Sequence, residues 1–142
     1  MKNQMRLEFD SISANEAFAR VTTAAFMTQM NPSMEEVADV KTAVSEAVTN
    51  AIIHGYRGEV HKIVITGEIE EEWLKLTVED QGVGIADVEK AMEPLYTTRP
   101  ELERSGMGFL FMEAFMDEVR VESEPGKGTV VFMKKRIGCQ EA

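Results

Sequence analysis

The chain has 142 residues, of which 44% are apolar and 28% are charged, and its formal net charge is −10. This length and composition predict a single globular domain over residues 1–142, with a core of its own. The acidic balance argues against direct binding to nucleic acid, because phosphate contacts need clustered Lys and Arg side chains. The basic run Lys134-Lys135-Arg136 is interpreted as a solvated strand end.

The sequence shows no sign of a membrane segment or a secretion signal. No apolar run approaches the length of a bilayer-spanning helix, and Met1 to Gln4 leads into a strand-like segment. Cys139 is the single cysteine, which excludes an internal disulfide. We therefore expect a soluble, cytoplasmic protein with no membrane partner.

The first elements are predicted from periodicity and end signals. Residues 6–10 alternate polar and apolar side chains, as a half-buried strand does. Ser13 and Glu16 have the spacing of a capping box and open a first helix, which Asn31-Pro32 interrupts.

A second capping box, Ser33 with Glu36, opens the next helix, and Gly55 is the expected left-handed residue at its end. Residues 94–104 are predicted to form a mobile loop. The remaining predicted elements are strands 61–66, 73–78, 119–122 and 129–133, a short helix 87–92 and an apolar helix 109–115. Grouped helices and hairpin-connected strands predict an α+β fold, a two-layer sandwich with a mixed β-sheet covered on one face by helices.

Three polar side chains lie one turn apart on the second helix: Glu46, Asn50 and His54. Asn50 offers a carbonyl oxygen to Mg²⁺ without adding charge, and Glu46 can accept a proton from a hydroxyl group or water. The alternative is that this pair is simply an exposed polar face. His54 is also consistent with a histidine bonded at the helix end.

A carboxylate followed by glycines, Asp80 with Gly82 and Gly84, comes directly after a predicted strand. The glycines allow backbone to approach a planar ligand closely, and the carboxylate can accept a hydrogen bond from an exocyclic amine such as that of adenine. An ordinary acidic turn is the alternative.

A third motif, Gly106-Met107-Gly108, precedes the apolar helix, where backbone N–H groups can bind phosphate. It is not a dinucleotide-binding fingerprint, because no strand leads into it and Phe111 stands in place of the third glycine. Arg104, just before the motif, either meets a terminal phosphate or is a solvated loop side chain. The three motifs together predict a site for ATP and Mg²⁺.

At these residues the chain resembles the GHKL ATP-binding superfamily, which includes gyrase, Hsp90 and histidine kinases. The segment 46–54 resembles its N box, 80–84 its G1 box and 106–108 its G2 box, while Thr129 resembles its late threonine near adenine. The resemblance implies the Bergerat ATP-binding fold, with ATP and Mg²⁺ as cofactors.

Over its whole length the chain is similar to the small anti-sigma serine kinases, notably in residues 1–20 and 46–56. This similarity implies a homodimer that holds a sporulation sigma factor away from RNA polymerase. It also implies a kinase that phosphorylates a serine on an anti-anti-sigma protein.

The resemblance also implies roles for individual residues. Glu46 would be the general base, Asn50 the Mg²⁺ ligand, and Arg104 the cation at the γ-phosphate. Asp80 and Thr129 would contact adenine, and Thr49 would lie on the adenine or phosphate side. The pocket would be completed by Gly82, Gly84, Gly106, Met107 and Gly108.

Arg20 is expected on the first helix, away from the apolar side chains. It either meets an acidic patch on the sigma factor or its antagonist, or is a solvated charge paired with Glu16 at i,i+4. Two alternatives remain for the whole chain. One is a sigma-binding module without kinase activity, and the other is a detached histidine-kinase catalytic domain.

Overall fold

The computed structural model describes residues 1–85 and 108–138 of the chain. Its centre is a five-stranded sheet with the strand order β1-β2-β3-β5-β4, in which every neighbouring pair is antiparallel. The strands are β1 (Lys2–Asp10), β2 (Lys62–Glu70), β3 (Trp73–Asp80), β4 (Glu118–Glu124) and β5 (Gly128–Arg136). All five predicted strands are confirmed, and each is longer than the sequence pattern indicates.

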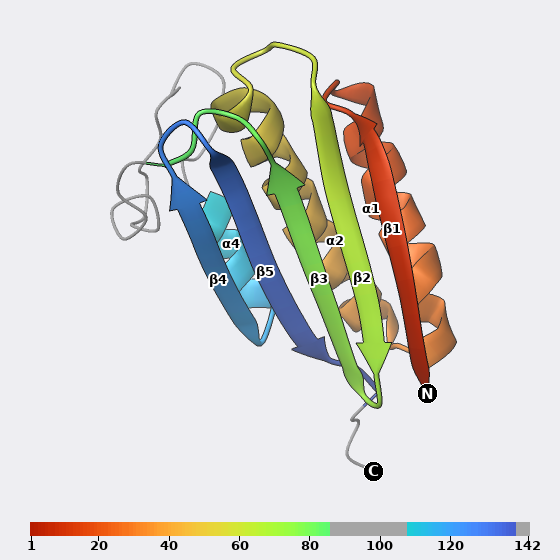
Figure 1. The fold of residues 1–142 in the computed structure, drawn as a ribbon. Coiled ribbons are helices and arrows are strands. Elements are labelled where there is room, and N and C mark those ends of the chain that lie inside the picture. Colours follow the sequence, from red (N-terminus) through yellow and green to blue (C-terminus); the bar gives the residue numbers. More distant parts are fainter. Residues whose placement is uncertain (86–107, 139–142) are drawn as a thin grey trace.

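The helices α1 (Ala14–Met27), α2 (Met34–Asn50) and α4 (Gly108–Phe115) lie on one face of the sheet (Figure 1). A 3-10 turn, η1 (Thr28–Met30), follows α1, and a π-helical turn, η2 (Ala51–Gly55), extends α2. No helix in the described part of the chain is both long and apolar enough to cross a bilayer.

The predicted two-layer α+β sandwich is confirmed, with one difference inside the sheet. A mixed sheet was expected, but the described strands have no parallel neighbours. The reason is that β5 returns from β4 through a tight hairpin and then pairs antiparallel with β3 as well. The predicted helix 87–92 and the predicted loop 94–104 lie outside the described residues.

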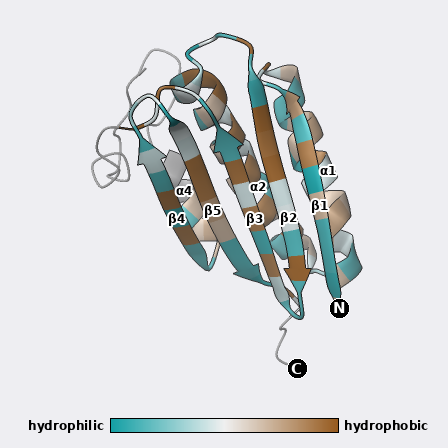
Figure 2. Cartoon of the chain, viewed as in Figure 1, coloured by the Kyte–Doolittle hydropathy of each residue, from teal (hydrophilic) through white to brown (hydrophobic). Residues whose placement is uncertain are grey.

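Alternation along the strands separates the two faces of the sheet. On β3, Leu74, Leu76 and Val78 are buried beneath the helices, whereas Trp73 and Lys75 are half-buried on the other face. Figure 2 shows the resulting change of hydropathy from residue to residue along the strands. Burial of each Leu or Val side chain of this kind stabilises the fold by about 1.5–3 kcal/mol.

The two predicted capping boxes have different outcomes. At α2, the Glu36 N–H donates to Ser33 Oγ at 3.0 Å and the Ser33 N–H donates to Glu36 Oε1 at 2.8 Å, which confirms the second box. The Ser13 side chain accepts no capping hydrogen bond and its backbone is already helical, so the prediction of the first capping box is wrong. The partner that it needs, Glu16, accepts a hydrogen bond from Ser45 on α2 instead.

The predicted left-handed end of the second helix at Gly55 is also wrong. Gly55 closes the π-helical turn η2, and the backbone first turns left-handed at Arg57 (φ 52°) and Gly58 (φ 87°). A glycine is needed at position 55 for a different reason, the close approach of a neighbouring strand described below.

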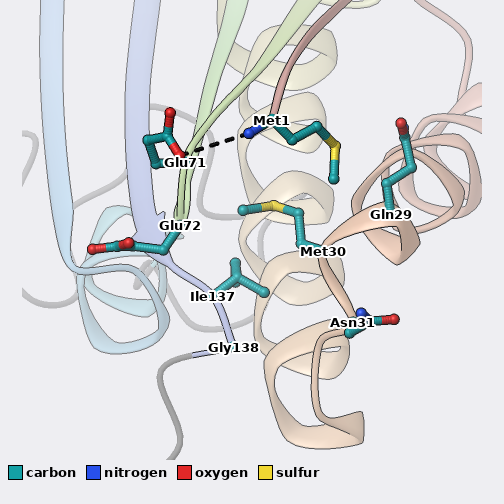
Figure 3. A pocket seen from close by; sticks show the side chains of 8 residues that line it. All are labelled: Met1, Gln29, Met30, Asn31, Glu71, Glu72, Ile137 and Gly138. Atoms are coloured by element: carbon teal, nitrogen blue, oxygen red, sulfur yellow. Dashed lines mark ion pairs between the residues drawn. The ribbon is translucent and has the colours of Figure 1, made fainter.

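The end of the sheet near Met1 and Gly138 contains a cavity of about 340 Å³ (Figure 3). Its acidic side chains are already paired. Glu71 lies 3.6 Å from the N-terminal amine, and Glu72 lies 3.0 Å from Arg136. The lining residues are Met1, Gln29, Met30, Asn31, Glu71, Glu72, Ile137 and Gly138.

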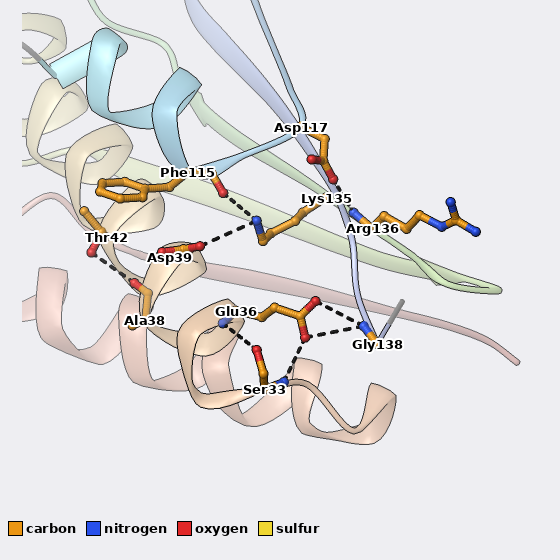
Figure 4. A network of polar contacts seen from close by, with 10 residues as sticks. All are labelled: Ser33, Glu36, Ala38, Asp39, Thr42, Phe115, Asp117, Lys135, Arg136 and Gly138. Atoms are coloured by element: carbon orange, nitrogen blue, oxygen red, sulfur yellow. Dashed lines mark hydrogen bonds and ion pairs between the residues drawn. The ribbon is translucent and has the colours of Figure 1, made fainter. Parts of the chain in front are cut away.

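Within the run Lys134-Lys135-Arg136, the interpretation as a solvated strand end holds for Arg136, which is exposed, and is wrong for the two lysines. The side chain of Lys135 is 13% exposed, donates to the carbonyl of Phe115 at 2.8 Å and lies 3.7 Å from Asp39 (Figure 4). Lys134 lies 4.4 Å from the centre of the Trp73 ring. Lys135 thereby links β5 to the end of α4 and the first half of α2.

Candidate functional site

The predicted residues Asp80, Gly82 and Thr129 lie where β3 ends and β5 begins, next to η2, which extends α2 at one end of the sheet (Figure 1). Asp80 is the last residue of β3 and lies directly opposite Thr129 of β5 in the strand register. Both are buried, with 6% and 7% of their surfaces exposed. Residues far apart in the sequence are thus brought together by the β3–β5 pairing.

The Asp80 carboxylate is an unusual buried acid. Burial raises its pKa to about 6, although backbone N–H groups of Gly82 and Thr129 act in the opposite direction. The Gly82 N–H donates to Asp80 Oδ1 at 2.9 Å. The remaining acceptor capacity of the carboxylate is available to a hydrogen-bond donor such as an amine.

Gly55 allows the helix end and the strand end to touch. A Cβ atom at Gly55 would lie 2.8 Å from Asp80 Oδ1, and one at Gly82 would lie 2.1 Å from the Gly55 carbonyl oxygen. At Gly84, φ is 76° and a Cβ would lie 2.2 Å from the Glu124 carbonyl oxygen, so side chains are excluded there as well. The glycines predicted around Asp80 therefore serve the close packing of backbone segments.

Two hydrogen bonds join η2 and the residue after it to the loop following Asp80. The Val83 N–H donates to the Gly55 carbonyl at 2.9 Å, and the Gln81 N–H donates to Tyr56 Oη at 2.8 Å. Tyr56 is buried and also donates to the carbonyl of Lys62, and its burial raises the pKa of its phenol. The sequence interpretation gave Tyr56 no role, because a lone Tyr after a helix carries no distinguishing signal.

Ser123 of β4 is a second residue that the sequence interpretation missed. It lies directly opposite Thr129 in the β4–β5 register, with its Oγ 2.8 Å from Thr129 Oγ1. Asp80, Thr129 and Ser123 therefore form a row across three neighbouring strands. A single serine inside an alternating strand gives no signal that would reveal this contact.

On α2, the predicted site residues Glu46, Thr49 and Asn50 are half-buried. The Nδ2 atom of Asn50 is buried and has no hydrogen-bond partner in the described part of the chain. Burying an unpaired N–H donor costs free energy unless a ligand accepts its hydrogen bond. His54 lies in η2, and π-helical turns are frequent at functional sites.

The described residues suit a magnesium ion that takes most of its ligands from a phosphate group and water. Residues 1–85 and 108–138 contain no group of three or more His, Cys, Asp or Glu side chains that could hold a metal. Mg²⁺ is usually held by one or two protein oxygens together with phosphate oxygens and waters. The Asn50 carboxamide fits that limited role.

The remaining predicted site residues are Arg20, Arg104 and the three residues 106–108. Gly108 begins α4, as expected for a glycine at a helix start, whereas Arg104, Gly106 and Met107 lie outside the described residues. Arg20 Nε lies 3.5 Å from Glu16 Oε1, which is the predicted i,i+4 pairing. The same Nε atom is buried and has no hydrogen-bond partner among the described residues, and the partner role of Arg20 remains a prediction.

Comparison with known proteins shows the family to which this chain belongs. Residues 11–135 match the histidine kinase-like ATPase domain. The chain is 59% identical over 143 aligned residues to the anti-sigma F factor of Geobacillus kaustophilus, covering all of this chain and 98% of that protein. It is 56% identical to the anti-sigma F factor of Clostridium acetobutylicum, covering 99% of both chains.

Solved structures share the fold at much lower identity. The RsbU and RsbW domains of a Mycobacterium tuberculosis protein match with a TM-score of 0.66 and 18% identity, covering 95% of this chain and 32% of that one. The catalytic domain of the histidine kinase ThkA matches with a TM-score of 0.54 and 19% identity, covering 94% and 97%. The chain belongs to the family of histidine kinase-like ATPase domains and, within it, to the family of the anti-sigma F factors.

Proposed function

We propose that this chain is an anti-sigma factor and an ATP-dependent serine kinase. It would sequester a sporulation sigma factor of the sigma F type and phosphorylate a serine on its anti-anti-sigma antagonist. The full-length identity to proteins named anti-sigma F factor supports the sigma partner. The observation that carries ATP binding is the buried Asp80–Thr129 pair lying against the end of the Asn50 helix.

On the base side, Asp80 would accept a hydrogen bond from the exocyclic amine of adenine, with Thr129 beside it. Gly82 and Gly84 would act indirectly, by letting the backbone segments around Asp80 pack closely, since a Cβ at either position would meet backbone within about 2.2 Å. Asp80 is well suited to this role because ionised acceptors make stronger hydrogen bonds than neutral ones.

On the phosphate side, Asn50 would hold Mg²⁺, which neutralises charge on the phosphate oxygens when bound. Thr49 would lie beside it on α2, and the backbone of Gly106, Met107 and Gly108 would receive phosphate oxygens at the start of α4. Arg104 would stabilise the charge that develops on the γ-phosphoryl group.

In the transfer step, Glu46 would accept the hydroxyl proton of the substrate serine. The serine oxygen would then bond to the γ-phosphorus, as the bond from that phosphorus to the β,γ-bridging oxygen breaks and ADP leaves. Phosphoryl transfer depends mainly on positioning and charge stabilisation, so a single carboxylate base suffices.

The kinase proposal is tested with γ-labelled ATP, the full chain and a candidate anti-anti-sigma protein. We expect acid-stable phosphoserine on that protein, and its loss in Glu46→Gln with ATP binding and sigma binding retained. Acid-labile phosphohistidine would instead identify a histidine-kinase catalytic domain. Sigma binding without any phosphotransfer would identify a binding module.

The metal proposal is tested by Asn50→Ala. We expect this variant to lose the Mg²⁺-dependent part of ATP affinity, measured by titration calorimetry with and without Mg²⁺. Thr23→Val is the matched control, because Thr23 Oγ1 is also buried without a partner among the described residues but lies on α1. An unchanged Mg²⁺ dependence in Asn50→Ala would refute the role of Asn50.

We further propose that α1 carries protein contacts, including those of a homodimer. Its outer face exposes large apolar side chains, with Phe18 49% and Val21 57% exposed, and Ile12 just before it 42% exposed. Arg20 borders this face, where it would meet an acidic partner surface. Val21→Glu should therefore convert the dimer to a monomer in light scattering, while a dimer that persists would exclude this face.

A further inference from the structure

The hydroxyl of Ser123 is surrounded by three polar partners from two other parts of the chain. Its Oγ lies 2.7 Å from the backbone nitrogen of Ile85, 2.9 Å from the carbonyl oxygen of Gly128 and 2.8 Å from Oγ1 of Thr129. Ile85 follows the Asp80 loop, while Gly128 and Thr129 begin β5. One half-buried hydroxyl thus connects β4, β5 and the loop after β3.

The directions of these hydrogen bonds follow from counting hydrogens. A serine hydroxyl has one hydrogen and two lone pairs. The Ile85 N–H can only donate, and the Gly128 carbonyl can only accept, so these two contacts use one lone pair and the hydrogen of Ser123. The remaining lone pair faces Thr129, whose hydroxyl must therefore donate to Ser123.

The consequence concerns the face that Thr129 presents to a ligand. With its hydrogen directed at Ser123, Thr129 Oγ1 offers lone pairs alone. The neighbouring Asp80 carboxylate also accepts hydrogen bonds, and it lies directly opposite Thr129 in the register. Two adjacent acceptors favour a ligand edge that carries an N–H donor, and they disfavour one that carries a carbonyl oxygen.

We propose that Ser123 is a positioning residue for nucleotide specificity: it fixes Thr129 as an acceptor, so that the pocket prefers 6-amino purines to 6-keto purines. This inference rests on the proposed ATP-binding function. Ser123 itself touches no part of the nucleotide, and it acts through the orientation of the Thr129 hydroxyl.

The test compares the affinities of the full chain for ATP and for inosine triphosphate, in which a keto oxygen replaces the amino group. In Ser123→Ala, the Thr129 hydroxyl is free to turn and donate to the keto oxygen. We expect the preference for ATP over inosine triphosphate to fall about five- to tenfold, the value of one hydrogen bond. Ser123→Thr retains a hydroxyl and should restore the preference.

Thr66→Val provides a matched control, because Thr66 and Thr77 form a similar pair of hydroxyl groups on the other face of the sheet. This variant should leave the preference unchanged. If Ser123→Ala weakens both nucleotides equally, or weakens neither, Ser123 has no role in specificity and the inference is overturned. If the unaltered chain binds neither nucleotide, the proposed function itself fails.

Discussion

The two ends of the sheet differ in how their acidic side chains are held. At one end, Asp80 is 6% exposed and bonded to backbone N–H groups, beside the linked hydroxyls of Thr129 and Ser123. At the other end, the side chains of Glu71 and Glu72 are 71% and 47% exposed and pair with the N-terminal amine and Arg136 around the open cavity of Figure 3.

This difference shows how burial changes the chemistry of an acidic side chain. Exposed ion pairs contribute about 0–1 kcal/mol, because water and salt screen them. A buried carboxylate loses its hydration, so a donor that reaches it gains a stronger hydrogen bond. The Asp80 end therefore has the chemistry to recognise a ligand.

Asp80→Asn should produce the largest effect on binding. Asn keeps the size of the side chain but removes its charge, and it presents a donor on one side. We expect ATP affinity to fall about 10- to 100-fold, as for loss of a charge-assisted hydrogen bond, measured by titration calorimetry. A change below about twofold would mean that Asp80 is not a base contact.

A change of pH tests the same carboxylate without mutation. The pKa of Asp80 is raised to about 6 by burial, so the acid is protonated as pH falls through 6. If the ionised form binds the amine, ATP affinity should fall up to about tenfold per pH unit below 6. The pH dependence should disappear in Asp80→Asn.

The raised pKa of Asp80 makes the stability of the fold depend on pH in the opposite direction from ATP affinity. Because the folded state binds this proton more tightly than the unfolded state, Asp80 favours folding at low pH, and this contribution is lost as pH rises from about 4 through 6. Nucleotide-free Asp80→Asn should therefore have the higher melting temperature at pH 7.5, with the difference shrinking toward pH 4. A lower melting temperature at pH 7.5 would contradict the cost assigned to the buried charge.

Gly55→Ala tests the close contact between η2 and β3. The added Cβ would lie 2.8 Å from Asp80 Oδ1, so the helix end or the strand end must move. We expect a loss of about 1–3 kcal/mol in the free energy of unfolding, measured by urea denaturation. Gly126→Ala is the comparison for backbone strain alone, since its Cβ would meet nothing within 4 Å but its φ of 81° is one that L side chains rarely adopt.

Glu71→Gln should have the smallest effect. The variant removes an exposed ion pair at the cavity end, and the backbone bond from the Glu71 N–H to the Met1 carbonyl remains. We expect a change of less than about 0.5 kcal/mol in unfolding free energy and no change in ATP affinity. A larger loss of affinity would make the cavity end part of the functional site.

Local signals in the sequence were reliable where local contacts decide the structure. The Ser33–Glu36 box formed because both partners lie within one turn. The Ser13–Glu16 box failed because Glu16 instead contacts Ser45, which is 29 residues away. Similarly, Gly55 has the spacing of a helix terminator, but the approach of Asp80 explains the need for glycine there.

For the candidate site, Asp80 was predicted because a carboxylate followed by glycines is distinctive, whereas Thr129 was predicted only from the resemblance to a known family. Tyr56 and Ser123 were missed, since their importance comes from partners set by strand register and loop packing. Register across β3, β5 and β4 depends on tertiary pairing, which a single sequence does not reveal.

The strand order also has a consequence for synthesis on the ribosome. β5, the last of the described strands, inserts between β3 and β4, so the Asp80–Thr129 pair forms only after β5 has been synthesised. Until then, the edge of β3 lacks its partner and is open to pairing with other chains. Nucleotide binding at the proposed site should therefore follow the synthesis and pairing of β5.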